Sequence, residues 1–409
     1  MKIAMFTDAY FPRINGVSVS VHSYAEELSR LGHEVCLVCL EYTEAQQKSS
    51  FFDERTNDRK APFKIIRIPS ITAFTFSKED RMIRLDKWHA IKKEMDEFSP
   101  DVIHINSEWS VGYFGAIYSR HRRIPFVFTF HTLWEDYLAN YINFIPKRGL
   151  RKIGIELVRF YLKRADVIIT PTRRIADVVE HYGISRKVHI LPTGIPSSKF
   201  EYNEEKAEFV RRTVFEKFPL LKGKKIMLFV GRIVKEKNLS FLYEVLKDVQ
   251  KELPDTALLM IGGGPYLEEL QELSVKQGLS ESVFFTGYIE GNDLIYFYRL
   301  ASVFTFPSKT ETQGLVTVEA MLSGLPVVAI GEMGTTDVMQ GDNGGFMVRD
   351  DAEEFSQKVI ALLTDSALHG QKATEALAWG NRWKISSLTP DLIGCYEEAI
   401  SIRRKKETT

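Results

Sequence analysis

Continuous apolar runs rich in Val, Ile and Phe alternate with helix-like runs along this chain of 409 residues. Such runs are typical of parallel strands that are buried on both faces of a sheet. We expect strands over 2–7, 34–40, 64–68, 101–106, 125–130, 166–170 and 188–192 in the first half, and over 225–231, 256–264, 283–288, 303–308, 325–331 and 344–348 in the second. The alternation predicts an α/β fold with doubly wound parallel sheets.

The chain is too long for one ordinary core, so two Rossmann-like domains are expected. Pro, Gly and Ser cluster near 191–200, and we place an N-terminal domain over 1–196 and a C-terminal domain over 197–385. After a turn at Pro390, we expect the helix over 386–405 to pack back on the first domain. Because ligands of open α/β sheets bind beyond the carboxyl ends of the strands, two facing domains predict a cleft.

Composition indicates the cellular compartment and shows a difference in charge between the two halves of the chain. The apolar fraction is 44%, no apolar run could span a bilayer, and no signal peptide is expected. Cys36 and Cys39 lie inside one strand run and are interpreted as buried, inert thiols, so we expect a reducing cytoplasm. Residues 1–195 hold 29 Lys+Arg and 23 Asp+Glu (+6), and the remainder holds 25 and 31 (−6). The basic half could face an anionic surface, or both halves could simply be solvated.

Two glutamates eight residues apart flank a helix start in the second half. Glu311 follows a strand run, and Gly314 opens a helix that carries Glu319. Backbone amides of Gly314, Leu315 and Val316 at the helix start favour an anion such as a phosphate. Glu319 could accept hydrogen bonds from ribose hydroxyls, and Glu311 from another polyol. Together they indicate a nucleotide sugar, whereas the alternative is that both glutamates only cap and solvate the helix.

A second motif, VGRIVKEKN over 230–238, leaves another strand end with Arg232 and Lys237. Two cations there can neutralise a diphosphate and stabilise it as it leaves. Lys235 and Glu236 fit a solvated charge run better.

The run PSKTETQGLVTVEAMLSGLPVVA over 307–329 resembles the E-x7-E motif of retaining glycosyltransferases of family 4, which have the GT-B fold of two Rossmann-like domains facing across a cleft. VGRIVKEKN resembles the same family's diphosphate motif, and the resemblance covers nearly the whole chain. It implies that Glu319 holds the ribose, Glu311 the donor sugar, and Arg232 and Lys237 the diphosphate. ETQG stands where many members have E-G-F-G, which looks like the subgroup that makes glycolipids from diacylglycerol.

Motifs in the first half resemble the same family. Gly16, after the first strand run, matches the glycine loop, where the backbone can lie close to the donor phosphates; the alternative is an ordinary turn. His131 matches the histidine beside the donor sugar, or is a satisfied turn histidine. HTLWEDY over 131–137 closely resembles the H-T-x-x-E-D-Y run of diacylglycerol glucosyltransferases. Candidate acceptor contacts are Asp8, Glu108, Trp134 and Asp136.

Further matches concern the nucleotide. TGYIEGND should line the base through the backbone near Tyr288 and Ile289, and Pro192 and Gly194 resemble the family's interdomain turn, where Gly194 is a donor-binding candidate. MIGGGPYLEEL lacks the dinucleotide spacing and should pack beside the nucleotide. No D-x-D triad or His/Cys cluster with ligand spacing occurs, so we expect no metal and no cofactor besides the UDP-sugar co-substrate.

The stretch 146–165 predicts an amphipathic helix with seven Lys+Arg and one Glu. Such a helix can lie on an anionic membrane, or it can cover a core with a solvated basic face. Neighbouring aromatic residues favour the membrane. The candidate membrane contacts are Arg148, Arg151, Lys152 and Arg159.

These motifs favour a retaining enzyme that transfers glucose from UDP-glucose to diacylglycerol, peripheral on the inner face of the cell membrane, with a nucleotide-sugar donor, a lipid acceptor and no nucleic acid as partners. The alternatives are a GDP-mannose or other transferase acting on a different or already glycosylated lipid, and a non-catalytic nucleotide-sugar sensor. A nicotinamide dehydrogenase is disfavoured because the dinucleotide fingerprint is missing.

Overall fold

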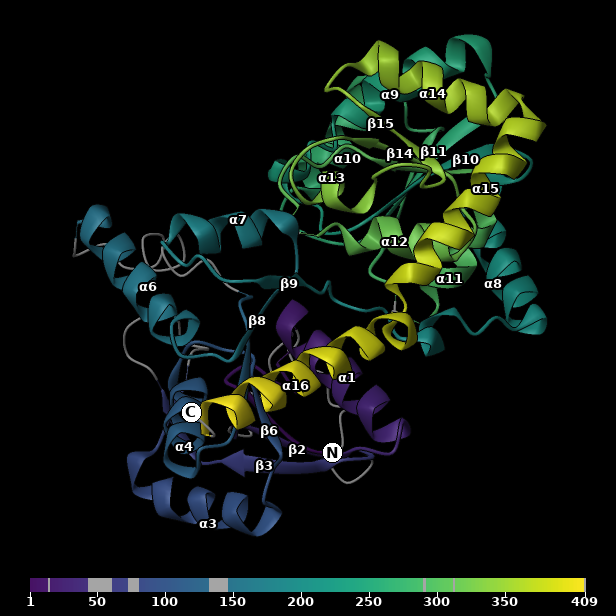
Figure 1. Ribbon diagram of the computed structural model, residues 1–409. Coiled ribbons are helices and arrows are strands. Elements are labelled where there is room, and N and C mark those ends of the chain that lie inside the picture. Colours follow the sequence, from purple (N-terminus) through teal and green to yellow (C-terminus); the bar gives the residue numbers. More distant parts are fainter. Residues whose placement is uncertain are drawn as a thin grey trace. The chain divides into compact units, whose positions relative to one another are not determined.

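The computed structural model describes residues 1–13, 15–42, 61–72, 81–131, 146–289, 292–311 and 313–407 (Figure 1). The chain forms two compact units, one of residues 1–194 with 385–409 and the other of 195–384. The sequence placed this boundary one or two residues later. Each unit is an α/β sandwich around a parallel sheet, so the predicted fold class is confirmed.

The N-terminal unit has a seven-stranded parallel sheet in the order β3-β2-β1-β6-β7-β8-β9. Its strands are β1 (Lys2–Thr7), β2 (Glu34–Leu40), β3 (Lys64–Ile68), β6 (Val102–Ile105), β7 (Phe126–Thr129), β8 (Val167–Thr170) and β9 (Val188–Ile190). A short antiparallel pair, β4 (Ser70–Thr72) and β5 (Arg81–Ile83), was not predicted. The helices are α1 (Gly16–Arg30), α3 (Trp88–Phe98), α4 (Ser110–Arg122), α6 (Lys147–Leu162), α7 (Arg173–His181) and α16 (Ile385–Glu407).

The C-terminal unit has a six-stranded parallel sheet in the order β12-β11-β10-β13-β14-β15. Its strands are β10 (Lys225–Val230), β11 (Thr256–Ile261), β12 (Val283–Gly287), β13 (Val303–Phe306), β14 (Val327–Ile330) and β15 (Gly345–Val348). Its helices are α8 (Glu204–Lys217), α9 (Phe241–Glu252), α10 (Leu267–Lys276), α11 (Leu294–Leu300), α12 (Leu315–Leu322), α13 (Gly334–Val338), α14 (Ala352–Thr364) and α15 (Ser366–Gly380).

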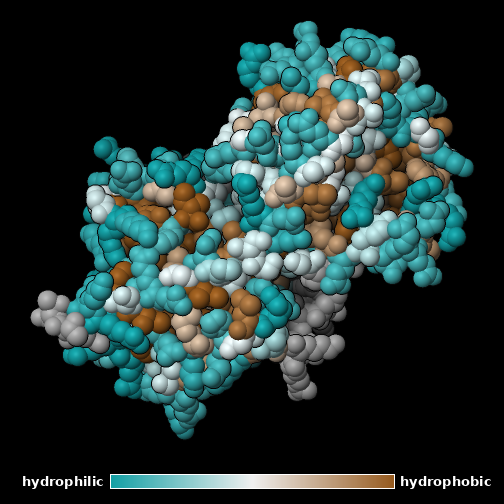
Figure 2. Space-filling model, turned by 45° about the vertical axis from the view of Figure 1, so that its right-hand side comes forward, coloured by the Kyte–Doolittle hydropathy of each residue, from teal (hydrophilic) through white to brown (hydrophobic). Residues whose placement is uncertain are grey.

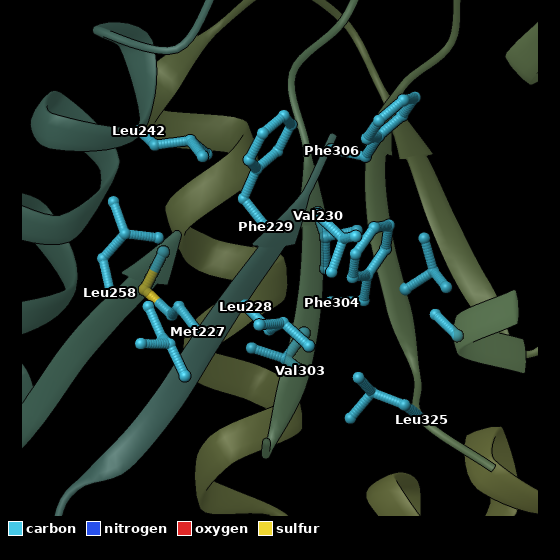
Figure 3. Close-up of a cluster of buried hydrophobic side chains, with 14 of the residues drawn as sticks. Met227, Leu228, Phe229, Val230, Leu242, Leu258, Val303, Phe304, Phe306 and Leu325 are labelled. Carbon is cyan, nitrogen blue, oxygen red and sulfur yellow. The ribbon is translucent and has the colours of Figure 1, made fainter. Parts of the chain in front are cut away.

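Both sheets have cores on two faces, which explains why their strands read as unbroken apolar runs. Neighbouring residues of β1 and β2 divide between two apolar clusters, one with Phe6 and Val38 and the other with Met5 and Leu37. In the C-terminal unit, Phe229 and Phe306 stack with ring centroids 6.2 Å apart (Figure 3). On the face shown in Figure 2, hydrophobic surface is divided into separate patches by hydrophilic side chains.

The C-terminal helix α16 packs beside α1 on the first sheet (Figure 1). Leu392 and Tyr396 are fully buried in the same cluster as Met5 and Leu37. The predicted turn at Pro390 is wrong, because this proline lies inside α16. Proline removes one helical hydrogen bond, but burial of the flanking side chains keeps the helix in place, and Thr389 donates a side-chain hydrogen bond to the Ile385 carbonyl at 2.8 Å.

The two connections between the units run side by side. Ile195 forms a bridge with Lys384, and its N–H donates to the Trp383 carbonyl at 2.8 Å. Gly194 lies against Ile385, whose Cα would be 2.9 Å from a Cβ at position 194. The C-terminal unit is therefore an insertion between two parts of the N-terminal unit.

Candidate active site

In each sheet the chain first adds strands on one side of the starting strand and then adds the remaining strands on its other side. The loops that leave the two adjacent strands at this switch point can hold a ligand. In the C-terminal unit this point lies between β10 and β13. The loop after β10 carries Arg232 and Lys237, and the loop after β13 carries Glu311 and Gly314. The two motifs that were singled out in the sequence therefore lie on adjacent strand ends.

Lys237 and Glu311 form the central contact of this site. The Lys237 Nζ lies 2.5 Å from the Glu311 Oε1, and only 8% of Lys237 is exposed. Removing two charges from water is costly unless they are paired, so each side chain compensates the other. A diphosphate that reached Lys237 would compete with Glu311 for it. The Glu311 carboxylate would then be released for another hydrogen-bond donor.

Arg232 lies at the exposed edge of the same loop. Three quarters of its side chain (75%) is exposed, and its guanidinium lies 3.3 Å from Glu236. Lys235 pairs instead with Glu269 at 2.7 Å, in line with its interpretation as part of a solvated charge run. Arg232 is therefore free to reorient toward an anion, whereas Lys237 is held in place.

Gly314 shapes the start of α12. Its φ of +61° is left-handed, which favours glycine, and a Cβ there would lie 3.2 Å from the Thr317 hydroxyl. The N–H groups of Leu315 and Val316 open the first turn, where no preceding helical carbonyl is available to them. The N-cap residue Gly314 provides no side-chain cap, and the Glu311 carboxylate pairs with Lys237. The assignment of Glu311 and Glu319 to the donor stays a prediction.

Glu319 is held by two residues that sequence reasoning missed. The Tyr298 hydroxyl donates to the Glu319 Oε2 at 3.2 Å, and the Lys199 Nζ lies 3.5 Å from Oε1. Tyr298 is only 1% exposed, and burial together with the neighbouring carboxylate raises its pKa well above the ordinary value. It therefore stays protonated as a donor. The two partners lie 21 and 120 residues from Glu319 in sequence, and no local motif marks them.

The remaining nucleotide candidates of this unit lie at neighbouring strand ends. Tyr288 follows β12 and is 80% exposed, while Ile289 packs against the core. The first glycine of MIGGGP has a packing reason: a Cβ at Gly262, whose φ is +138°, would lie 1.9 Å from the Gly231 carbonyl oxygen. This glycine lets the loop after β11 lie directly against the loop that carries Arg232.

In the N-terminal unit, Asp8 lies in a network of hydrogen bonds, and its acceptor contact stays a prediction. Its carboxylate accepts hydrogen bonds from the Ser107 hydroxyl at 2.6 Å, the Ser110 hydroxyl at 2.7 Å and the Val111 N–H at 2.9 Å. It therefore holds the start of α4 to the loop after β1. Burial raises the pKa of Asp8, an effect that these hydrogen bonds oppose. An acceptor contact would have to displace partners that are already in place.

Three further candidates of the N-terminal unit lie near strand ends or helix starts: Glu108, Gly16 and His131. Glu108 is buried. Gly16 is the exposed first residue of α1, and a Cβ there would meet nothing within 4 Å, so the fold itself does not require glycine. The His131 Nε2 lies 3.4 Å from the Asn106 Oδ1, and burial lowers the pKa of His131 to about 4. His131 is therefore neutral near pH 7. Trp134 and Asp136 lie outside the described residues.

Gly194 is explained by packing, because the space for a Cβ is occupied by Ile385. The neighbouring Pro192 carbonyl accepts a hydrogen bond from the Tyr24 hydroxyl at 2.9 Å. Both residues therefore fix the exit from the N-terminal unit, and these contacts do not assign Gly194 to the donor.

The α6 helix covers the first core and turns a basic face outward. Its buried side chains include Leu150, Val158, Tyr161 and Leu162, whereas Ile153 is 56% exposed. The candidate membrane cations Arg148, Arg151 and Lys152 are exposed, and Arg159 pairs with Glu156 at 2.6 Å. The core-covering interpretation of this helix is therefore correct, and contact of its basic face with a membrane stays a prediction.

The described residues contain neither a membrane-spanning helix nor a cluster of metal-ligating side chains. No helix within them is both long enough and apolar enough to cross a bilayer. They contain no group of three or more His, Cys, Asp or Glu side chains that could hold a metal ion. Catalysis without a metal stays a prediction. All three cysteines are buried and none forms a disulfide, and burial raises the pKa of Cys36 to about 12, as expected of an inert thiol.

The chain matches two family models and several known proteins. The model of glycosyl transferases group 1 matches residues 210–378, and that of Glycosyltransferase Family 4 matches residues 14–199. An alpha-monoglucosyldiacylglycerol synthase of Streptococcus pneumoniae is 32% identical over 81% of this chain and 71% of its own length. One of Acholeplasma laidlawii is 29% identical over 92% of both chains. A GDP-mannose-dependent alpha-mannosyltransferase of Mycolicibacterium smegmatis is 26% identical over 98% of this chain and 99% of its own length.

Among solved structures, HepE of Anabaena in complex with UDP superposes with a TM-score of 0.73 at 15% sequence identity, covering 97% of this chain and all (100%) of HepE. Sucrose-phosphate synthase of Thermosynechococcus elongatus gives a TM-score of 0.68 at 18% identity, covering 98% of each chain. These likenesses concern the fold. With two parallel-sheet units, both family models and a relative at 32% identity, the chain is a member of glycosyltransferase family 4 with the GT-B fold.

Proposed function

We propose that this glycosyltransferase transfers glucose from UDP-glucose to diacylglycerol with retention of the α configuration. The observation that carries the proposal is the convergence of Lys237, Glu311 and Glu319 around the start of α12. In this assignment the diphosphate takes Lys237 and Arg232, the sugar takes Glu311 and the ribose takes Glu319. The names of two relatives, both alpha-monoglucosyldiacylglycerol synthases, support the donor sugar and the lipid class.

In the proposed reaction the bond between the anomeric carbon and the diphosphate breaks, and the acceptor hydroxyl forms the new bond on the same face. The hydroxyl proton passes to the leaving phosphate oxygen. Lys237 and Arg232 stabilise the negative charge that develops on the diphosphate. His131, which is neutral and can donate or accept a hydrogen bond, is assigned to the donor sugar by its match to the family's histidine.

The test is a turnover panel in which UDP-glucose, other UDP-sugars and GDP-mannose are combined with diacylglycerol, glucosyl-diacylglycerol and soluble acceptors. We expect turnover with UDP-glucose and diacylglycerol, and an α linkage in the product. The second candidate is a GDP-mannose-dependent mannosyltransferase, favoured by the relative from Mycolicibacterium smegmatis that aligns over 98% of this chain. Turnover with GDP-mannose alone would support it and refute the glucosyl assignment.

The outward basic face of α6 is the proposed contact with the membrane. Each cation near an anionic surface contributes about 1 kcal/mol, and salt weakens this attraction. We expect anionic vesicles to sediment the enzyme at low salt, and a variant in which glutamine replaces Arg148, Arg151, Lys152 and Arg159 to sediment much less while UDP binding is unchanged. Equal sedimentation of the two proteins would show that these cations are only a solvated helix face.

A further inference from the structure

A hollow of about 580 Å³ lies in the C-terminal unit along α8 and α11. The two helices are neighbours in Figure 1, and the Lys206 Nζ of α8 lies 2.5 Å from the Asp293 Oδ1 at the start of α11. The polar residues that line the hollow and carry the argument are Tyr202, Glu204, Glu208, Arg211, Lys222, Tyr296 and Arg299.

The hollow exists because the face of α8 that lines it is charged. Residues 204, 207, 208, 211 and 215 line the hollow, and their spacing of three or four places them on one side of the helix. A surface helix normally presents an apolar stripe on its inner side, but this face reads Glu, Ala, Glu, Arg, Phe. Val214 is the buried residue of this helix. Charged side chains resist full burial, so α8 stays apart from α11 along this line.

This hollow is distinct from the candidate active site. Lys222 and Gly223 lie two or three residues before β10, and Leu300 lies three residues before β13. They are therefore near the amino ends of the strands whose carboxyl ends lead to Lys237 and Glu311. The six residues of β10 span roughly 20 Å at about 3.3 Å per residue. Tyr296, which lines the hollow, and Tyr298, which contacts Glu319, project from opposite sides of α11 because two residues turn a helix by about 200°.

The cations of the hollow are little used by the fold. Within the part of the chain that the structure describes, Arg299 and Lys222 form no ion pair, and the nearest carboxylate to Arg211 is that of Glu208 at 3.8 Å. The Arg299 guanidinium instead lies 4.1 Å from the centre of the Tyr202 ring, an exposed cation–π contact. Arginine and lysine side chains that keep their donors free are the usual partners of phosphate oxygens.

The other side chains of the hollow suit a hydroxylated ligand. Glu204 and Glu208 can accept hydrogen bonds from hydroxyl groups, and the rings of Tyr202 and Tyr296, 5.8 Å apart, offer apolar faces with polar tips. Cations, carboxylates and tyrosine rings along one hollow fit a molecule with a phosphate and a polyol. We propose that this hollow binds a phosphate ester of a polyol, either a soluble sugar or glycerol phosphate or the headgroup of a phospholipid.

The test measures binding with the active site occupied. The assay is a calorimetric titration of glucose 6-phosphate and of glycerol 3-phosphate into the full-length enzyme saturated with UDP. Glucose and inorganic phosphate are titrated in the same way, because each carries only one part of the proposed ligand. We expect saturable binding in the millimolar range or tighter. The double variant Arg211→Gln, Arg299→Gln should bind at least about tenfold more weakly, because it loses two charge-assisted contacts. The matched control is Arg212→Gln, whose residue is on α8 but does not line the hollow; it should bind as wild type does.

Two further arms separate the sources of the ligand and protect the result from a folding artefact. If phosphatidylglycerol vesicles sediment wild type more than the double variant, while neither soluble ester binds, the ligand is a lipid headgroup. Binding of a soluble ester alone assigns a metabolite. The proposal is overturned if wild type binds neither the soluble esters nor the vesicles. It is also overturned if the double variant, with an unchanged melting temperature, binds the same ligands as tightly as wild type does. UDP affinity should be equal in all variants, so failure here leaves the proposed function untouched.

Discussion

Tyr298→Phe tests whether Glu319 is a positioned ligand group. The change removes the Tyr298 hydroxyl, which donates to the Glu319 Oε2, and keeps the ring, which packs against Phe304 with centroids 5.8 Å apart. A hydrogen bond to a charged group contributes about 1.5–3 kcal/mol. The contact is long at 3.2 Å, which places it at the lower end, near 1.5 kcal/mol.

In binding terms, about 1.5 kcal/mol corresponds to roughly a tenfold rise in the Kd for UDP. This is a ceiling, because Lys199 still contacts the other carboxylate oxygen. The assay is a calorimetric titration of UDP into wild type and variant, with kcat measured at saturating donor. We expect a higher Kd with kcat nearly unchanged, because the ribose takes no part in bond breaking. Tyr296→Phe, on the opposite side of α11, is the matched control.

The reasoning is refuted if Tyr298→Phe binds UDP as wild type does while it remains folded. It is also refuted if kcat falls and the Kd does not change, since the hydroxyl would then act on the reaction instead of the nucleotide. A melting temperature within a few degrees of wild type is required for either conclusion. The ring keeps its packing, so we expect the variant to meet this condition.

Three more predictions concern the charge of Lys237, the need for a metal ion and the buried His104. Lys237→Ala should lower kcat by about 10²–10³ and change the donor KM less, because its charge matters most as the diphosphate leaves; an effect confined to KM would contradict that role. Activity should persist in a chelator at fixed ionic strength, and a complete loss that magnesium restores would overturn metal-free catalysis. Burial lowers the pKa of His104 from 6.5 to about 3, so between these values the unfolded chain binds a proton that the folded chain does not, and stability falls as the pH falls. Denaturant titrations from pH 7 to 5 should show a loss to which His104 contributes up to about 1.4 kcal/mol per pH unit below 6.5, while His131, whose pKa is also lowered, contributes with the same sign. A slope in His104→Gln equal to that of wild type would exclude His104 as a cause.

The sequence predicted the elements whose signal is local. Every strand of the two large sheets was expected because strands buried on both faces form apolar runs, whereas β4 and β5, of three residues each, are too short to leave a pattern. Pro390 was interpreted as a turn because local rules cannot register the burial that keeps α16 intact. The Lys237–Glu311 pair joins residues 74 apart, and the two motifs were assigned separately to one donor.

The site partners that were missed share a physical cause. Asp8, a candidate acceptor contact, has hydrogen-bond partners at the start of α4, about 100 residues later, which the sequence did not indicate. Tyr298 reaches Glu319 from α11, and Lys199 reaches it from the segment that follows the connection between the two units. Such contacts depend on which elements become neighbours, and side-chain chemistry along the chain does not specify this.

The insertion of the C-terminal unit sets an order for folding during synthesis. Residues 1–194 emerge first, but Leu392 and Tyr396, which fill one face of their core, are made last. At about 5–20 residues per second, the 190 residues from 195 to 384 delay them by roughly 10–40 s, and the apolar face under α16 stays open to water or to a chaperone. The C-terminal unit, although its synthesis starts second, is the first that can be completed.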